Sequence, residues 1–163
     1  MSYPEATYHG QGGEISAEYR RADVQPELQV GGDSNASYLA TGASTNGQFG
    51  LYRWDMGPEA SGPGTHFHRS ISESFFVLSG TVRLFDGAQW IDALAGDFLF
   101  VPEGGLHAFR NESGKKASML ILFAPGAPRE GYFDTLADIA TSGRQLTPEE
   151  WTEFFLRHDT FWV

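Results

Sequence analysis

A long succession of short apolar runs, each ended by turn residues, most constrains how this chain can fold. The pattern extends from Glu14 to about Gly126 and favours an all-β sandwich or barrel. A chain of 163 residues is long enough to close one hydrophobic core, so we expect one domain. The predicted strands cover residues 14–20, 37–42, 48–56, 73–78, 80–85, 88–92, 97–101, 106–111 and 117–124.

The sharpest local turn signal is Asp86-Gly87, which separates two of these runs. A two-residue Asp-Gly loop needs positive φ and suits a type I′ turn. We therefore predict a tight hairpin that joins residues 81–85 to residues 88–92. Residues 1–13 are polar and glycine-rich and are predicted to form an N-terminal arm, followed by the barrel at 14–126.

Residues 127–163 change period and are predicted to form a helical tail. Apolar residues recur every three or four positions between Phe133 and Ala140, which indicates an amphipathic helix. Thr147-Pro148-Glu149-Glu150 has the pattern of a capping box with proline at the first helical position, so a second short helix follows. Both helices are expected against the outside or mouth of the barrel. The aromatic stripe of the second helix, Trp151, Phe154 and Phe155, is interpreted as packing.

The charge balance narrows the possible partners. Eleven Lys and Arg residues stand against 21 Asp and Glu residues, for a net charge of −10. Such a surface repels phosphate backbones and anionic lipids, so we expect neither a nucleic-acid nor a membrane partner. The chain has no cysteine, which excludes thiolate chemistry and fits a cytoplasmic protein. We find no signal-peptide pattern and no apolar run long enough to span a membrane.

Two glycine-punctuated blocks concentrate the metal-binding residue types. The first contains His66, His68 and Glu73, and the second contains His107. Residues i and i+2 of a strand point to the same side, so His66 and His68 should project together into the barrel. The other two histidines, His9 and His158, are predicted to lie at the surface, where His158 could cap the last helix.

Three neutral imidazoles and one carboxylate suit one divalent transition metal: iron, manganese, cobalt, nickel, copper or zinc. Such a set leaves one or two positions open for water, substrate or dioxygen. An unpaired Glu73 inside a barrel would be costly to bury as a charged group, which also favours a metal.

The two blocks resemble the paired motifs of the cupin superfamily. The first motif, His-x-His, four residues, Glu, six residues, Gly, is matched at His66, His68, Glu73 and Gly80; its leading glycine is replaced by Ala60. The second motif is matched in full at Gly96, Pro102, Gly104, His107 and Asn111. Together the motifs cover about 50 of the 163 residues.

This resemblance implies a cupin jelly-roll barrel (a double-stranded β-helix) with two short C-terminal α-helices. It implies that His66, His68, Glu73 and His107 are the metal ligands. It also implies a homodimer, because cupins commonly dimerise through sheet faces and exchanged N-terminal strands.

An apolar pocket is expected around the metal. Its predicted residues flank the motifs or alternate along the preceding strand: Tyr52, Trp54, Phe75, Val77 and Phe109. Such a pocket suits a small aromatic or hydroxy-carbonyl substrate. The same aromatic residues could instead fill the barrel interior, which has little spare room.

The single barrel with a helical tail looks similar to quercetin-dioxygenase-type monocupins, which implies a metal-dependent dioxygenase. By that resemblance Glu73 is both ligand and catalytic base, because a carboxylate beside a dication can accept a proton near neutral pH. Two other classes stay open: a redox-neutral metal cupin (cyclase, isomerase, epimerase or lyase), and a non-catalytic cupin that binds a small molecule.

Overall fold

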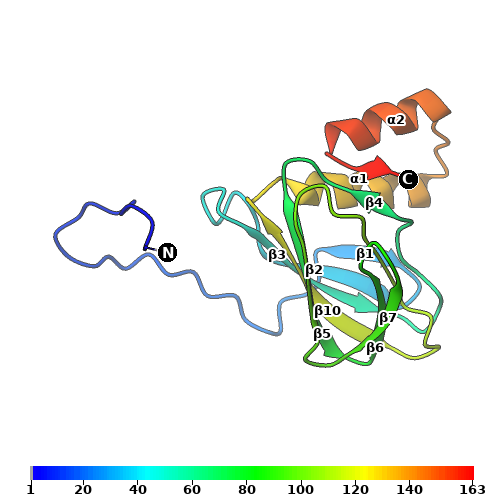
Figure 1. Cartoon of the computed structure of the whole chain (residues 1–163), viewed down its shortest axis with the longest axis horizontal. Coiled ribbons are helices and arrows are strands. Elements are labelled where there is room, and N and C mark those ends of the chain that lie inside the picture. The colour runs from blue at the N-terminus through cyan, green and yellow to red at the C-terminus, as the bar shows by residue number, and fades with distance from the viewer. Residues whose placement is uncertain (1) are drawn as a thin grey trace.

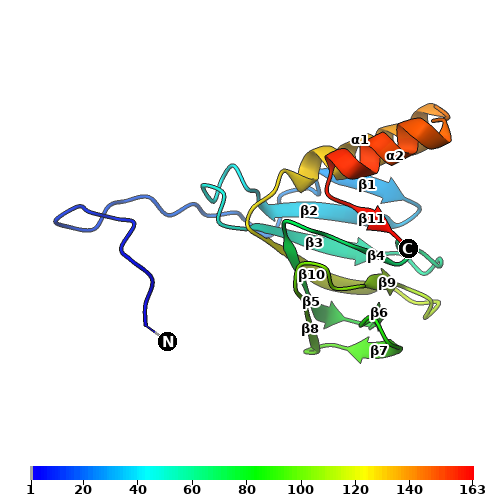
Figure 2. The same cartoon turned by 45° about the horizontal axis from the view of Figure 1, so that its top comes forward.

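The computed structural model describes residues 2–163 and consists of a β-barrel with two helices packed across one end (Figures 1 and 2). The strands are β1 (Leu28–Gly31), β2 (Ser34–Ala40), β3 (Gly50–Met56), β4 (His66–Phe67), β5 (Ser72–Ser79), β6 (Thr81–Phe85), β7 (Trp90–Leu94), β8 (Phe98–Val101), β9 (Ala108–Arg110), β10 (Ala117–Ala124) and β11 (Phe161–Trp162). The helices are α1 (Arg129–Ser142) and α2 (Pro148–Arg157).

Antiparallel pairing arranges the strands in three sheets. The largest has the order β1-β2-β3-β10-β5-β8, a second has β7-β6-β9, and β11 pairs with β4. Strand β10 lies between β3 and β5, and its register places Phe123 opposite Glu73. The all-β jelly-roll barrel with two C-terminal helices is therefore confirmed.

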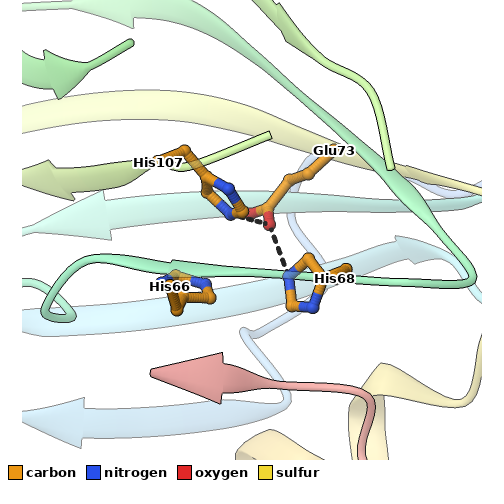
Figure 3. Close-up of side chains that lie close together, drawn as sticks. All are labelled: His66, His68, Glu73 and His107. Atoms are coloured by element: carbon orange, nitrogen blue, oxygen red, sulfur yellow. Dashed lines mark hydrogen bonds and ion pairs between the residues drawn. The ribbon is translucent and has the colours of Figure 1, made fainter. Parts of the chain in front are cut away.

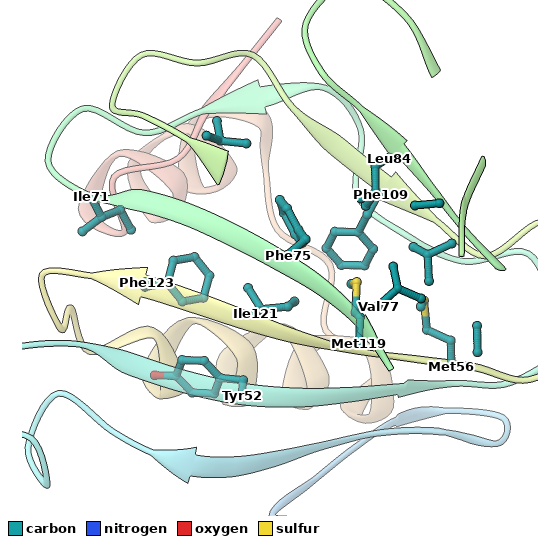
Figure 4. Packing of buried hydrophobic residues seen from close by; sticks show 14 residues of the cluster. Tyr52, Met56, Ile71, Phe75, Val77, Leu84, Phe109, Met119, Ile121 and Phe123 are labelled. Carbon is teal, nitrogen blue, oxygen red and sulfur yellow. The ribbon is translucent and has the colours of Figure 1, made fainter. Parts of the chain in front are cut away.

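The core fills the space between the sheets (Figure 4). Alternate residues of β5 and β10, among them Phe75, Val77, Met119 and Ile121, point inward and are almost completely buried. This alternation is the two-residue period that predicted the strands. The core reaches the histidines, because the ring centre of Phe75 lies 6.0 Å from that of His107 and the ring centre of Phe123 lies 6.2 Å from that of His68.

Two predictions about local structure were wrong. Residues 14–20 form no strand, because Ile15 and Tyr19 are almost fully exposed and no neighbouring strand pairs with them. The hairpin between β6 and β7 pairs Phe85 with Trp90, so its loop has four residues rather than two. The Asp86 carboxylate closes this loop by accepting hydrogen bonds from the backbone of Ala88 and Gln89, both 2.8 Å.

The two helices lie across one end of the barrel (Figure 2), and residues of both helices line a cavity together with His66 and Glu73. The capping box of α2 is confirmed: Thr147 Oγ1 accepts from Glu150 N, and Glu150 accepts from Thr147 N. Helix α1 is tied to the sheet by hydrogen bonds from Tyr38 to Asp134 (2.7 Å) and from Tyr52 to Glu130. The tail therefore packs firmly on the barrel mouth.

The last three residues return to the barrel, which the sequence did not suggest. Strand β11 pairs Trp162 with His66 and Phe161 with Phe67. The division of the chain at residues 13 and 126 stays a prediction; the first strand begins at Leu28 and the last barrel strand ends at Ala124. Neither helix of residues 2–163 has the length and apolar character needed to cross a membrane.

Candidate metal centre

Three separate segments of the barrel bring four polar side chains to one point (Figure 3). His66 opens β4 and His68 follows that strand, Glu73 lies in β5, and His107 immediately precedes β9. The backbones of His66 and His107 exchange two N–H···O hydrogen bonds of 3.0 Å each. This reciprocal pair fixes the distance between the two motifs and holds their histidines side by side.

The four side chains form a compact, buried cluster. One ligand atom from each of His66, His68, Glu73 and His107 lies within 4.8 Å of the other three. Glu73 Oε2 is 3.1 Å from His68 Nε2 and 2.8 Å from His107 Nε2. All four residues are at most 6% exposed. The sequence prediction that these residues converge is therefore met by the structure.

The outer nitrogen of each ring sets its tautomer. Nδ1 of His66 contacts the carbonyl of Gly64 at 2.9 Å, and Nδ1 of His107 contacts the carbonyl of Gly105 at 2.9 Å. Nδ1 of His68 contacts the carbonyl of Asp159 at 2.5 Å. A carbonyl oxygen only accepts, so each Nδ1 must donate. In the neutral rings every Nε2 therefore presents a lone pair, the form that binds metals.

Neutral rings of this tautomer would direct three lone pairs toward one another and toward the Glu73 carboxylate, an arrangement that a positive charge between them would stabilise. Burial and the nearby charge of His107 lower the pKa of His66 to about 4, so that ring is neutral at physiological pH. Burial pushes the pKa of Glu73 up, but the contacts of its Oε2 with Nε2 of His107 and of His68 outweigh burial and hold the pKa below its usual range. Glu73 is therefore a carboxylate.

The pKa of His107 shifts in the opposite direction to that of Glu73. Burial lowers the pKa of His107, but its hydrogen bond to Glu73, the Glu73 charge and the contact with the Gly105 carbonyl together outweigh burial, so the net shift is upward. A proton on this ring would balance part of the carboxylate charge. A divalent metal would supply that positive charge instead, and three imidazole nitrogens with one carboxylate oxygen are the donors that transition metals prefer. The donor set fits such an ion.

The C-terminal tail supports the cluster from behind, a contribution that no sequence signal predicted. The Asp159 carboxylate accepts hydrogen bonds from the backbone N–H groups of Arg69 and Ser70 and from Ser70 Oγ, at 2.7–3.1 Å. Its carbonyl accepts from His68 Nδ1. One residue thus holds both the His68 ring and the loop after it. Partners of this kind orient metal ligands and tune their basicity.

A cavity of about 460 Å³ opens beside the cluster, between the barrel and the helices. His66 and Glu73 line it, and so do two of the predicted pocket residues, Trp54 and Phe109. The other three predicted pocket residues, Tyr52, Phe75 and Val77, lie in the core and are fully buried. Alternation along a strand identifies inward-facing residues, but it does not distinguish the packed part of a barrel interior from the open part.

Much of the cavity wall comes from the helical tail. Helix α1 contributes Arg129, Tyr132 and Phe133, and strand β11 contributes Trp162. The interpretation of the α2 aromatic stripe as packing holds for Phe154, which is buried and stacks on Tyr132. For its two neighbours the structure adds another role, because Trp151 and Phe155 line the cavity. Their helical period predicted a buried face without showing what that face would contact.

Comparison with known proteins agrees with this geometry. Residues 52–123 match the family described as "Cupin domain". The chain is 32% identical over 107 residues to quercetin 2,3-dioxygenase of Bacillus subtilis (strain 168), a match that covers 66% of this chain and 31% of that protein. The match therefore spans about a third of the relative's length.

Solved structures share the fold at lower identity. An RmlC-like cupin from Shewanella frigidimarina NCIMB 400 has a TM-score of 0.57 at 20% identity, covering 71% of this chain and 96% of that one. The polyketide cyclase RemF from Streptomyces resistomycificus has a TM-score of 0.53 at 19% identity, covering 66% and 78%. At this level of identity the similarity concerns the fold alone. Residues 52–123 thus contain a cupin domain by the family match, and the barrel and the two motifs agree with it.

Proposed function

We propose that the protein is a metal-dependent dioxygenase that acts on a small aromatic substrate with a hydroxyl group beside a carbonyl. The observation that carries this proposal is the position of the cluster: three imidazole Nε2 atoms and the Glu73 carboxylate converge beside a largely apolar cavity. The named activity of the Bacillus subtilis relative supports it, within the third of that protein that the match covers.

In this proposal His66, His68, Glu73 and His107 hold one divalent transition metal. When bound, the metal supplies Lewis acidity and, for a redox-active ion, the ability to engage dioxygen. The aromatic rings of the cavity, including Trp54 and Phe109, hold the flat substrate and exclude water. The two oxygen atoms of dioxygen, the oxidant, are incorporated into the substrate.

Glu73 is the proposed catalytic base. Its Oε2 faces His68 and His107, whereas its Oε1 has no hydrogen-bond partner among residues 2–163. Because Glu73 lines the cavity, Oε1 is available to a substrate hydroxyl. The carboxylate can therefore accept the hydroxyl proton, and the substrate becomes the electron-rich anion that reacts with dioxygen.

Oxygen uptake by protein loaded separately with each candidate metal tests the proposal, with flavonols, which carry a hydroxyl group beside a carbonyl, as substrates. Glu73→Gln should lower the rate at least about 100-fold, the range for loss of a general base. Glu103→Gln, which changes an exposed carboxylate, is the matched control. Metal content is measured for each variant, so that a lost proton acceptor is distinguished from a lost metal.

The same experiment decides among the alternatives. Complete turnover of a substrate without oxygen would overturn the dioxygenase and establish a redox-neutral metal cupin. A ligand that binds tightly and is recovered unchanged with every metal would establish a binding protein.

The expected homodimer belongs to this proposal. The outer face of the large sheet exposes large apolar side chains, with Phe98 63% and Phe100 55% exposed on β8 and Phe76 beside them on β5. A contiguous apolar surface of this kind favours association.

Light scattering should give twice the monomer mass, and Phe98→Ser/Phe100→Ser should give a monomer. Leu156→Ser, which changes an exposed residue of α2, is the control. A wild-type protein with the mass of a monomer would overturn the dimer.

A further inference from the structure

Arg129, the first residue of α1, is a buried cation in the wall of the cavity. Its side chain is 4% exposed, yet it lines the cavity together with Glu73 and His66. Three aromatic rings surround the guanidinium: its Cζ lies 4.2 Å from the ring centre of Tyr132, 5.1 Å from that of Phe123 and 5.5 Å from that of Phe133. These rings hold the guanidinium in place, but none of them carries a formal negative charge that could balance it.

The hydrogen bonds of Arg129 are incomplete. Nη1 donates to the carbonyl of His158 at 2.7 Å and to Thr160 Oγ1 at 3.4 Å. Within residues 2–163, Nε is buried without a hydrogen-bond partner and Nη2 makes no hydrogen bond. No Asp or Glu in the described chain forms an ion pair with it. A buried charge with unused donors is costly unless a ligand completes it.

Charge in the cavity points to the nature of that ligand. Among the described residues that line it, only Glu73 and Arg129 carry a formal charge at neutral pH. A divalent metal at the cluster would more than neutralise Glu73, and Arg129 would then leave the apolar cavity strongly positive. An anionic ligand restores the balance. Nε and Nη2 also lie on one edge of a guanidinium, the edge that binds a carboxylate through two parallel hydrogen bonds.

We propose that Arg129 binds a carboxylate of the substrate, so that the cavity selects flat aromatic acids over neutral aromatic molecules of the same shape. The inference rests on the proposed function, because it names the substrate class of that same site. Arg129 is a specificity residue here: it holds the anionic end of the substrate on the helix wall while the other end faces Glu73 and His66.

Binding of naphthoate and of its neutral analogue naphthamide tests this assignment by calorimetry, with protein that is either zinc-loaded or stripped of metal. Wild-type protein should bind naphthoate at least about 10-fold more tightly than naphthamide in both forms, as expected for hydrogen bonds to a charged group. Arg129→Gln should bring the two affinities together by weakening naphthoate alone. Arg157→Gln, which removes an exposed arginine on α2, should retain the preference.

Three results would overturn the proposal. A preference present with zinc and absent without it would assign the carboxylate to the metal. A preference that survives Arg129→Gln would exclude Arg129, and an equal loss of both ligands in that variant would mean that Arg129 only anchors His158 and the tail. If Arg129→Gln does not fold, Arg129→Lys decides, because it keeps the charge and loses the two-donor edge: a reduced preference supports the proposal and an unchanged one overturns it.

The result is independent of the proposed reaction. Neither probe needs dioxygen or turnover, so absence of oxygen uptake leaves a measured preference for naphthoate standing. Conversely, oxygen uptake with equal binding of the two probes would support the dioxygenase and refute the role of Arg129.

Discussion

The two walls of the cavity are built in different ways. The barrel wall carries His66 and Glu73, which lie within eight residues of one another in one motif and are held by strand pairing. The helix wall carries Arg129, Trp151 and Trp162, which come from α1, α2 and β11 and meet only when the tail folds back on the barrel. In the proposals above, the reaction depends on the barrel wall and the choice of an acidic substrate depends on the helix wall.

The largest expected effect tests the barrel wall. His66→Ala/His107→Ala removes two of the four proposed ligands and leaves too few donors for a stable site. We expect purified wild-type protein to contain near-stoichiometric transition metal and the double variant to contain almost none, measured by mass spectrometry.

His9→Ala is the control, because that histidine is exposed in the N-terminal segment. Equal metal content in the wild type and the double variant would refute the cluster as the metal site. Wild-type protein that stays empty even with added metal would do so as well.

A smaller effect is expected where the helix wall supports the barrel wall. Asp159→Gly keeps the carbonyl that contacts His68 and tolerates the residue's positive φ of 50°, but it removes the carboxylate that holds the backbone of Arg69 and Ser70. Loss of a partner that orients a metal ligand weakens metal binding about 10- to 100-fold. Competition with a chelator measures this affinity, and Asp138→Asn, which changes an exposed residue of α1, is the control. Unchanged metal affinity in Asp159→Gly would show that the helix wall does not contribute to metal binding by the barrel wall.

The same carboxylate predicts a pH dependence of stability. Burial raises the pKa of Asp159, but hydrogen bonds from Ser70 and Arg69 outweigh it, so the folded-state pKa lies below the ordinary value. A lowered carboxyl pKa stabilises the fold fully above the unfolded-state pKa of about 3.9, and this stabilisation is lost as the pH falls through the folded-state pKa. The difference in Tm between metal-free wild type and Asp159→Gly should therefore be constant from about pH 8 to pH 5 and shrink below about pH 4. A difference that grows on acidification would contradict the role of the carboxylate.

These contrasts also explain how far the sequence could predict the molecule. The barrel wall was predictable because His66 and His68 follow the two-residue period of a strand, and because Glu73 and His107 stand at fixed spacings from turn glycines. Such information is local, and strand geometry converts it directly into position. Strand geometry predicted that His66 and His68 point to the same side, and the resemblance of the two motifs to those of cupins implied that Glu73 and His107 join them.

The helix wall was not predictable for physical reasons. The helical period at Trp151 and Phe155 indicates a face that avoids water, and a packed core and a ligand cavity satisfy that requirement equally. Arg129 and Asp159 have no periodic or motif signal, since their roles arise from contacts with residues 29 to 90 positions away. The absent strand at residues 14–20 has the same cause: a strand needs a neighbour, and the sequence does not say whether one is present.

The smallest expected effect distinguishes the cavity from the core. Phe75 and Trp162 are both aromatic and both lie near the cluster, with ring centres 6.0 Å from His107 and 5.1 Å from His66 respectively. Phe75 is fully buried, so Phe75→Ala should lower the free energy of unfolding by about 3–5 kcal/mol. Trp162 is 41% exposed and lines the cavity, so Trp162→Ala should cost little stability and weaken the binding of an aromatic probe such as naphthoate about fivefold.

Thermal unfolding and calorimetry on the two variants measure both quantities. If Trp162→Ala unfolds as easily as Phe75→Ala and leaves probe affinity unchanged, then β11 is part of the core, and the helix wall has no separate role in choosing the substrate. If Trp162→Ala lowers the affinity for the probe while its Tm stays near the wild-type value, the ring of Trp162 contributes to substrate binding and not to the core. This result would support a helix wall that selects the substrate. Trp162 is the sharpest place to test it, because its backbone pairs with His66 while its ring faces the cavity.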